Sequence, residues 1–501
     1  MLSEPSRRLT PSGTFWILLI AGLTLRCVAL TRPLVDAHLL RQCQTAAAVS
    51  DMAASPGFAL SSHIPWIGDH AQSYVQELPI YNFLAMGVSA ATGNLTLSGK
   101  LVSVALWAIS FLLLQPIWRR MLDAAAIPWA NLLFVVAPLG VFFGQAFMPE
   151  TLVQVLAFGF VLLLVRYDAK PTLPRWIACV ATGFLGLLVK APEVAHLYLI
   201  LVALIVRRSG WPALFRPRHV IAGILSAAGV LAWSRYLNSV NANSYAFGST
   251  ESNLVGFIGP LASRFRLQPW LMIAMYLGVF VAPGPVIFAV VQGARKLAAR
   301  PAFLLLAWLG ATAFFYLLWF GNTAAVQSYY NLPALAPVCA LFGIGLASTL
   351  AHRSRAWMVA AAAFVVACAV PGTVYLFRPD RTILAAAEWT HAHTEPGSLI
   401  LVHAAHRPDM QDYWPNAVFP FYTQRPTFIW AASMPADMRD DAIARSRYAV
   451  VTLPPPEEKI ATMIRKFRGM PKPPRPSVEW LVERGFAPFA EDAGFVVFRR
   501  Q

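Results

Sequence analysis

PAFLLLAWLGATAFFYLLWF, residues 301–320, is a run of 20 residues without a charged side chain. A helix needs roughly 20 predominantly apolar residues to cross the hydrocarbon core of a bilayer, so this stretch predicts a transmembrane helix. Further stretches meet or approach the same requirement and predict about eleven spans in total. Their expected limits are 14–30, 98–117, 128–147, 150–166, 175–190, 193–207, 218–237, 269–292, 331–350 and 356–377.

The overall composition agrees with a membrane protein. Of the 501 residues, 57% are hydrophobic and 13% are charged, whereas soluble domains have about 45–50% and about 25%. A net charge of +16 would suit a nucleic-acid-binding protein if the basic residues formed one surface. Many of them lie instead in short loops between apolar runs, so we expect the bilayer, and no nucleic acid, as the partner.

The basic residues also predict the orientation of the chain, because Lys and Arg are enriched in cytoplasmic loops. With the N-terminus inside, the inner loops hold about sixteen basic residues and the short outer loops about six. The apolar run after Arg7 and Arg8 lacks a small-residue cleavage site and is expected to be a retained signal anchor. An odd number of spans then predicts a multi-pass protein of the bacterial inner membrane with a periplasmic C-terminus.

The residues after about 377 are Pro-rich and charged, and they alternate between short strand-like and helix-like elements. This pattern predicts a small α/β domain over 378–501, following a transmembrane domain over 1–377 whose first periplasmic loop covers about 31–97. The expected strands are Ser398–His403, Tyr448–Leu453 and Phe495–Arg499, and the expected helices are Leu384–His393, Glu457–Arg468 and Val478–Arg484. The five cysteines have no CxxC spacing, which argues against a disulfide framework or a cysteine metal site.

The first long outer loop contains the sequence DAHLLRQCQT, residues 36–45. On a helix, His38, Arg41, Gln42 and Thr45 would share one polar stripe, with Asp36 at its N-terminal edge. The alternative is that Asp36 only caps the helix and that the stripe is the solvated face of an amphipathic surface helix. The short apolar run 79–93 later in this loop is expected to be an interfacial or re-entrant helix.

Other charged residues are predicted on the same outer side: Glu77 before Pro79, Glu150 at the start of a span, and Lys190 at the end of one. Taken singly, the two glutamates are explained by favourable interaction with a helix dipole and the lysine by a side chain that reaches the interface. Taken together they indicate function, because charges at membrane depth are costly and usually serve a purpose.

These motifs resemble the polyprenyl-phosphate-sugar-dependent glycosyltransferases of the C superfamily. The bacterial branch related to lipid A aminoarabinose transferase and protein O-mannosyltransferases is the most similar group. Each motif is short, and their order along nearly the whole chain and their shared side of the membrane carry the resemblance. The matching stretches are Asp-x-His-x-x-Arg-Gln from Asp36, Glu-x-Pro-x-Tyr from Glu77, Pro149-Glu150, Lys190-Ala-Pro192 and Gln327-Ser-Tyr-Tyr330-Asn-Leu-Pro333.

The resemblance implies a C-type glycosyltransferase fold, a polyprenyl (undecaprenyl) phosphate-sugar donor, and a lipid, glycan or protein acceptor. Asp36 occupies the position of the catalytic base and Glu150 that of a second acidic group. The candidate donor-phosphate contacts are Arg41, Lys190, Tyr329 and Tyr330, with Arg264 and Arg266 as weaker ones. The candidate acceptor-binding or orienting residues are His38, Gln42, Glu77 and Tyr81, and Asp36 and Glu77 are candidate ligands of a divalent metal ion.

Some positions depart from the family pattern. Leu78 stands where the aminoarabinose branch has a lysine, and Leu40 where many relatives have an aromatic residue, which argues against lipid A aminoarabinose transfer. Two alternatives to an enzyme are a transporter or flippase of a lipid-linked saccharide and a non-catalytic envelope assembly protein. The first would be expected to show inverted repeats, and none is evident. The sugar, the acceptor and the role of the C-terminal domain are not fixed by the sequence.

Overall fold

The chain folds into two compact units in a computed structural model. Unit 1 comprises Met1–Leu30, Lys100–Ala227 and Ile258–Leu376, and unit 2 comprises Thr31–Gly99, Ala228–Phe257 and Phe377–Gln501. The first long loop is thus grouped with the C-terminal residues. The structure describes residues 13–55, 60–64, 68, 73–75, 77–242, 258–299, 302–320, 328–404, 417–430, 436–453, 478–492 and 494–501.

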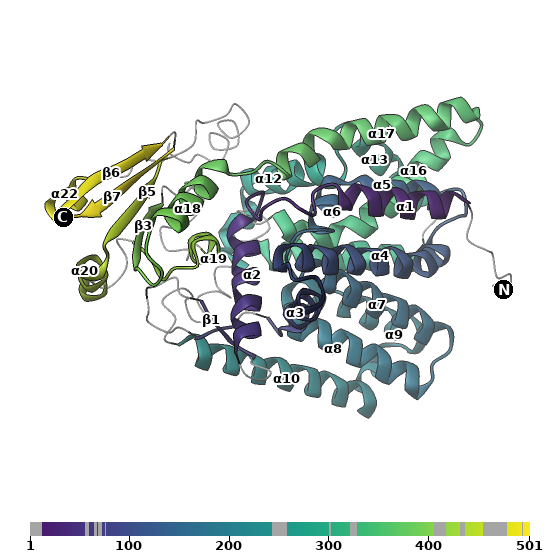
Figure 1. The fold of residues 1–501 in the computed structure, drawn as a ribbon. Coiled ribbons are helices and arrows are strands. Elements are labelled where there is room, and N and C mark those ends of the chain that lie inside the picture. Colours follow the sequence, from purple (N-terminus) through teal and green to yellow (C-terminus); the bar gives the residue numbers. More distant parts are fainter. Residues whose placement is uncertain are drawn as a thin grey trace. The chain divides into compact units, whose positions relative to one another are not determined.

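Unit 1 is built almost entirely from helices (Figure 1). Two of these, α4 and α10, continue into unit 2. The longer elements are α1 Gly13–Cys27, α4 Leu95–Met121, α5 Ile127–Val136, α6 Pro138–Phe143, α7 Glu150–Ala169, α8 Leu173–Ala195, α9 Tyr198–Ser209, α10 Pro217–Asn241, α12 Leu267–Tyr276, α13 Val286–Ala299, α14 Phe303–Leu318, α16 Leu335–Leu350 and α17 Arg355–Leu376. The short 3-10 segments are η1 Trp211–Phe215, η2 Leu261–Phe265 and η4 Ser328–Ala334, and η3 Leu277–Val281 is a short π-helical segment.

Helix length and composition confirm a multi-pass membrane protein. Among the described residues, 6 helices are long and apolar enough to cross a membrane, or up to 7 with one bent pair. Shorter apolar helices at 13–27, 127–136 and 303–318 coincide with three more of the expected spans. The number of about eleven spans stays a prediction.

Two expected spans are interrupted by proline. The stretch 128–147 divides into α5 and α6 at Ala137, which has extended backbone angles before Pro138. A proline lacks the N–H that would continue the helix and disfavours the helical conformation of the residue before it. The stretch 269–292 is likewise not one straight span: its two halves, Leu267–Val281 and Val286–Ala299, are bent by 105° around Pro283-Gly284-Pro285.

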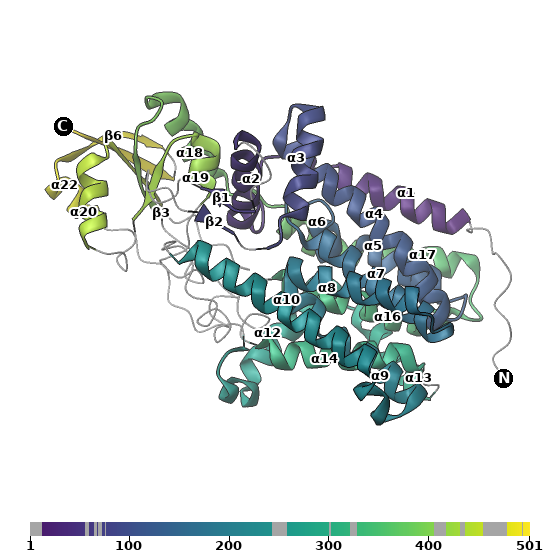
Figure 2. The ribbon, with the colours of Figure 1, turned by 90° about the horizontal axis from the view of Figure 1, so that it is seen from below.

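Helix α16 lies between α5 and α13, and small residues allow the close approach (Figure 2). A side chain added at Gly293 of α13 would overlap the carbonyl oxygen of Leu341, and one at Gly345 would overlap that of Ala289. Gly343 faces α5 in the same way. Without a hydrophobic driving force between helices in lipid, such backbone contact is a main source of association.

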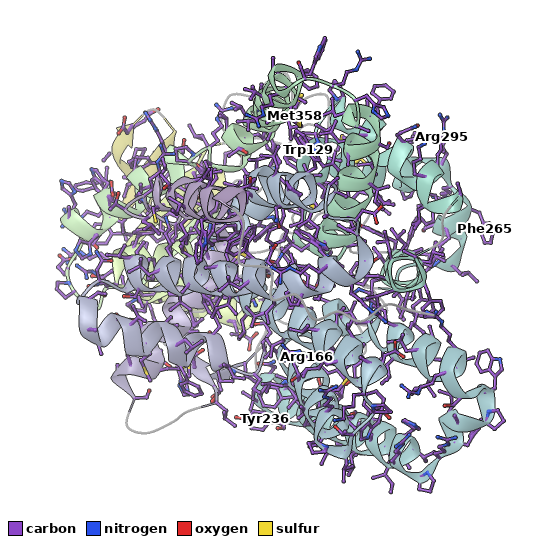
Figure 3. The ribbon with its side chains drawn as sticks, turned by 90° about the vertical axis from the view of Figure 1, so that its right-hand side faces the viewer. Trp129, Arg166, Tyr236, Phe265, Arg295 and Met358 are labelled. Carbon is purple, nitrogen blue, oxygen red and sulfur yellow. The ribbon has the colours of Figure 1, made fainter. Side chains whose placement is uncertain are left out.

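The outer faces of several helices expose large apolar side chains. Only 6% of the most apolar window of α10 is buried, and 22% of that containing α17. The outward-facing Phe265 is 86% exposed, and Arg295 projects from the surface of α13 (Figure 3). Exposed apolar area of this extent suits contact with lipid chains better than contact with water.

Unit 2 combines the first long loop with an α/β domain. The loop forms α2 Leu39–Ala54, the hairpin of β1 Ser62–His63 with β2 Ser73–Tyr74, and α3 Ile80–Thr92. The later helices are α18 Arg381–His393, α19 Val418–Thr423, α20 Ala436–Arg445 and α22 Glu479–Glu483. The remaining strands are β3 Ile400–Ala404, β4 Thr427–Ile429, β5 Tyr448–Thr452, β6 Phe486–Asp492 and β7 Phe495–Arg500.

These five strands form one sheet in the order β4-β3-β5-β7-β6. Strand β3 pairs in parallel with β4 and β5, whereas β7 runs antiparallel to β5 and β6. The α/β character expected from the sequence is confirmed, including strands β3, β5 and β7. The short β4 and the partly exposed β6 were not predicted, and the expected helix Glu457–Arg468 lies outside the described residues.

Candidate active site

Asp36 lies in a segment without regular structure that immediately precedes α2. The helix begins at Leu39 rather than at Asp36, because His38 takes left-handed backbone angles, with φ 57° and ψ 29°. The Asp36 carbonyl accepts the N–H of Leu39, and one carboxylate oxygen accepts a hydrogen bond from the Gln42 side chain. Asp36 is only 7% exposed. Its carboxylate is therefore held by α2 without capping that helix.

The polar stripe of α2 is buried, so it is not the solvated face of a surface helix. Arg41, Gln42 and Thr45 are all buried. A nitrogen of Arg41 contacts both carboxylate oxygens of Glu77, and another donates to Gln44 at 3.0 Å. The expected phosphate-binding arginine and the expected acceptor-orienting glutamate thus form an ion pair with each other. Ion pairs between Arg and a carboxylate are directional and strong when shielded from water.

The remaining predicted residues of this loop differ in exposure. His38 is half-buried, whereas Tyr81 is fully buried on α3 and donates its hydroxyl to the carbonyl oxygen of Gly99 at 2.8 Å. This bond fixes the tyrosine to the N-terminal end of α4. Asp36, His38, Arg41, Gln42, Glu77 and Tyr81 all belong to unit 2.

A second cluster of predicted residues lies in unit 1 around Lys190. Its Nζ atom lies 2.7 Å from Oε1 of Glu150 and 2.7 Å from Oε1 of Glu193, and all three side chains are buried. The same ammonium group lies 4.1 Å from the ring centre of Tyr329 and 5.3 Å from that of Tyr330. One cation is thus surrounded by two carboxylates and two aromatic faces, an arrangement that lowers the free energy of a buried charge.

A kink in α8 creates this arrangement. Lys190 itself has non-helical backbone angles, with φ −159° and ψ 84°, two residues before Pro192. The break turns Lys190 and Glu193 toward Glu150, which is the first residue of α7. Glu193 was not assigned a role from the sequence. Its spacing of three residues from Lys190 around a proline was the available signal.

Sequence analysis also missed Arg26, which is fully buried on α1. Its guanidinium donates to the carbonyl oxygens of Val135 at 3.2 Å and Gly140 at 2.8 Å, on either side of the break between α5 and α6, and it lies 3.6 Å from the ring centre of Trp107. Arg26 therefore supplies a donor to backbone carbonyls near the interruption by Pro138; Gly140 also accepts the N–H of Gly144, and a carbonyl left unpaired in an apolar interior would be costly.

The weaker candidates are less convincing as ligands of phosphate. Arg264 donates to the backbone oxygens of Ile258 and Leu317, which gives it a structural contact on the turn before α12, and Arg266 is exposed. Gln327 lies outside the described residues.

Within the described parts of the chain, no three His, Cys, Asp or Glu side chains gather as metal ligands, and Arg41 contacts both carboxylate oxygens of Glu77. A metal at Asp36 and Glu77 stays a prediction.

Solved structures resemble this chain over nearly its whole length. ArnT from Cupriavidus metallidurans bound to undecaprenyl phosphate is 15% identical, with 97% of this chain and 98% of that chain covered and a TM-score of 0.60. The oligosaccharyltransferase of Archaeoglobus fulgidus with a tethered acceptor peptide is 12% identical, with 88% and 68% covered and a TM-score of 0.55. Both are glycosyltransferases of the C superfamily. The chain has the C-superfamily glycosyltransferase fold.

The C-superfamily fold confirms what the sequence motifs predicted about architecture. No protein-family model matches the chain, and no curated protein sequence matches it either. The resemblance at such low identity concerns the backbone fold, so the roles of individual residues still rest on their own geometry. That geometry gives two clusters, one around Asp36 in unit 2 and one around Lys190 in unit 1.

Proposed function

We propose that this protein is a glycosyltransferase that moves a sugar from a polyprenyl phosphate to an acceptor hydroxyl at the periplasmic face of the bacterial inner membrane. The observation that carries the proposal is the geometry of Asp36: a buried carboxylate, held by Gln42 in an irregular segment at the start of α2. The C-superfamily fold and the undecaprenyl phosphate in the ArnT structure support a lipid-linked donor.

The proposed reaction exchanges one C–O bond at the anomeric carbon for another and moves one proton. The Asp36 carboxylate takes the proton of the acceptor hydroxyl, and the oxygen of that hydroxyl attacks the anomeric carbon of the donor sugar. The bond between that carbon and the phosphate oxygen breaks, and polyprenyl phosphate leaves with the electron pair. General-base help of this kind is typically worth about 10²–10⁴ in rate.

In this proposal two ion-pair clusters, one in each unit, hold charged side chains in place. Glu77 holds the side chain of Arg41, a residue of α2, so that its guanidinium is preorganised instead of mobile. Lys190 lies between the carboxylates of Glu150 and Glu193. Because these two negative charges offset its positive charge, the cluster would attract a phosphate less than a lone lysine would. We therefore assign Lys190 mainly to holding Glu150 in place, and propose the Tyr329 and Tyr330 hydroxyls as donor contacts.

The proposal is tested with Asp36→Asn in membranes of a strain deleted for the natural gene. Turnover of the strain's own undecaprenyl phosphate-linked sugars is followed as release of undecaprenyl phosphate by mass spectrometry. We expect a loss of about 10²-fold or more, with unchanged amounts of inserted protein. Asp123→Asn, at an exposed residue between α4 and α5, is the matched control and should keep full activity. A fully active Asp36→Asn enzyme would remove the proposed base.

The same strain tests a flippase. Translocation of the lipid-linked sugar without release of undecaprenyl phosphate would replace the enzymatic proposal, whereas release that depends on Asp36 supports it. Comparison of the envelope glycans and lipids of the deletion strain with those of its parent then identifies the acceptor.

A further inference from the structure

The chain just before Asp36 is fastened to the C-terminal domain through its backbone. The N–H of Leu34 donates to the hydroxyl oxygen of Tyr422 at 2.6 Å. The next residue, Val35, accepts at its carbonyl oxygen the N–H of Asp380, also at 2.6 Å. Leu34 is 0% and Val35 1% exposed. Two consecutive residues are thus held from outside the loop, which fixes the direction in which the chain enters Asp36.

Both partners in the C-terminal domain are themselves anchored. Tyr422 is on α19, whose residues Val418 and Phe419 are fully buried and which packs against both α18 and α2. Figures 1 and 2 show α19 beside α2, although the two helices are far apart in the sequence. Asp380 is the N-cap of α18, where its side chain accepts the N–H of Ile383 at 3.2 Å. The backbone of Asp380 is therefore as fixed as the start of that helix.

The same segment is held from its other side by α2. The Cys43 thiol donates to the Leu34 carbonyl oxygen at 3.4 Å, and Gln42 donates to the Asp36 carboxylate. Burial, and then the nearby Asp36 charge, raise the pKa of Cys43 well above its usual range, which keeps the thiol protonated as a donor. Leu34 therefore has its N–H bound by the C-terminal domain and its C=O bound by α2.

This support from two sides matters because residues 31–38 form no helix or strand. A buried segment without its own hydrogen-bond ladder depends on other elements to pair its N–H and C=O groups. The left-handed angles of His38 add local strain, which persists only where the surroundings determine the conformation. The position of Asp36 is thus set by contacts that the loop does not supply itself.

We propose that the C-terminal domain positions the Asp36 segment, with Tyr422 and Asp380 as the positioning residues. The sequence left the role of this domain open. The inference deepens the proposed function and rests on Asp36 as its base. It gives the C-terminal domain an indirect part in catalysis, because both residues act through Asp36 and neither touches substrate in this scheme.

Hydrogen exchange of the full-length protein in detergent tests the positioning directly, without substrate. In Tyr422→Phe the ring is kept but the acceptor of the Leu34 N–H is lost. We expect exchange within residues 31–38 to accelerate about tenfold or more, while β3 and β5 keep their protection. The matched control is Tyr448→Phe, which removes a hydroxyl on strand β5 of the same domain. Unchanged exchange in 31–38, or equal acceleration in the control, would overturn the proposal.

Turnover gives a second, independent measurement in the same membranes, by release of undecaprenyl phosphate from the strain's own lipid-linked sugars. Tyr422→Phe should lower kcat about 5- to 100-fold and leave the KM for the donor unchanged, because the base is displaced while the donor contacts remain. A raised KM with unchanged kcat would contradict a role through Asp36.

The outcomes also separate this inference from the proposed function. If Asp36→Asn keeps full activity, the proposed base fails, whatever the exchange data show. If Asp36→Asn is inactive while Tyr422→Phe keeps both its kcat and its exchange pattern, only the positioning role is wrong. In an Asp36→Asn background, Tyr422→Phe should cause no further loss of activity, since both changes act through the same carboxylate.

Discussion

Lys190 Nζ lies 2.7 Å from Glu150 Oε1, and both side chains are buried in unit 1. The pair joins the broken end of α8 to the first residue of α7, so it fixes two helix ends at once. Removing one member of a buried pair leaves a charge without compensation, which costs more than the pair itself contributes.

Lys190→Met should therefore destabilise the protein, because Glu150 and Glu193 would face each other without a cation. We expect a loss of about 3–5 kcal/mol, measured as a fall in the thermal unfolding midpoint in detergent. Lys296→Met, at an exposed position on α13, should leave the midpoint unchanged. Equal midpoints for the two variants would mean that the Lys190 contacts add nothing to stability.

Arg41→Lys should lower turnover although the positive charge is kept. A lysine ammonium is a point charge and does not reproduce the planar fork with which Arg41 contacts Glu77 and Gln44. We expect a decrease of about tenfold in release of undecaprenyl phosphate, equivalent to about 1.4 kcal/mol. The exposed Arg120→Lys serves as the control. Full activity of Arg41→Lys would show that charge alone suffices at this position.

Cys43 should resist alkylation at alkaline pH. Burial, and secondly the Asp36 charge, raise the pKa of its thiol, so at pH 8 less thiolate is present than for an ordinary cysteine. In a variant with Cys43 as its single cysteine, we expect N-ethylmaleimide to react with the folded protein about 100-fold more slowly than with the same protein in denaturant. Asp36→Asn should speed the reaction of Cys43, because the pKa then falls.

The raised pKa of Cys43 also determines how its contribution to folding stability changes with pH. Because the folded-state pKa of Cys43 lies above the unfolded value, the buried neutral thiol contributes stability below the ordinary thiol pKa. That contribution is lost as the pH rises beyond it, so replacement by serine should flatten the decline of stability at alkaline pH. A decline that is equally steep without the thiol would assign it to other groups.

Arg26→Met should be strongly destabilising. The variant removes the Arg26 donor from the Val135 carbonyl oxygen in an apolar interior, at about 1–3 kcal/mol, whereas Gly140 keeps the N–H of Gly144 at 3.0 Å. Arg175 also donates to two backbone carbonyls, those of Arg166 and Lys170, but at an exposed place where water can replace it. Arg175→Met should therefore change thermal stability little, and a similar loss in both variants would refute the effect of burial.

Gly293→Ala tests the close approach of α13 and α16. The added Cβ would overlap the Leu341 carbonyl oxygen, which belongs to a helix backbone and cannot rotate away. We expect separation of the two helices and a stability loss of at least about 1–3 kcal/mol. Gly310→Ala, on α14 with open space around the added atom, should be neutral or slightly stabilising because alanine favours helix. Wild-type stability of Gly293→Ala would mean that the helices can move apart without cost.

The sequence predicted the helical regions well because a span is marked by composition and length alone. It did not predict where spans break. The stretch 269–292 meets the length criterion although its two halves diverge by 105°. The pairs of residues that mark the breaks, Ala137-Pro138 and Pro283-Gly284, were visible, but proline in an apolar helix is tolerated often enough that it does not by itself decide between a kink and a break.

The sequence predicted which residues belong to the candidate site better than it predicted the contacts among them. The predicted topology put Arg41, Glu77, Glu150 and Lys190 on the same side of the membrane. Whether each cation contacts a phosphate or a carboxylate depends on side-chain directions, which the spacing of residues in the sequence does not give. Tyr422 was missed because the C-terminal residues look like a separate domain in the sequence. Its hydroxyl acts on a backbone group, and such contacts leave no motif.

The bond between Leu34 and Tyr422 joins residues that are 388 positions apart. At a synthesis rate of roughly 5–20 residues per second, the second partner leaves the ribosome roughly 20–80 s after the first. Late in that interval the nascent chain contains every motif assigned to chemistry, but its Asp36 segment is held by α2 alone. The protein would thus become active only after the C-terminal domain has been translated and exported. Products truncated near residue 377 would insert into the membrane without becoming active.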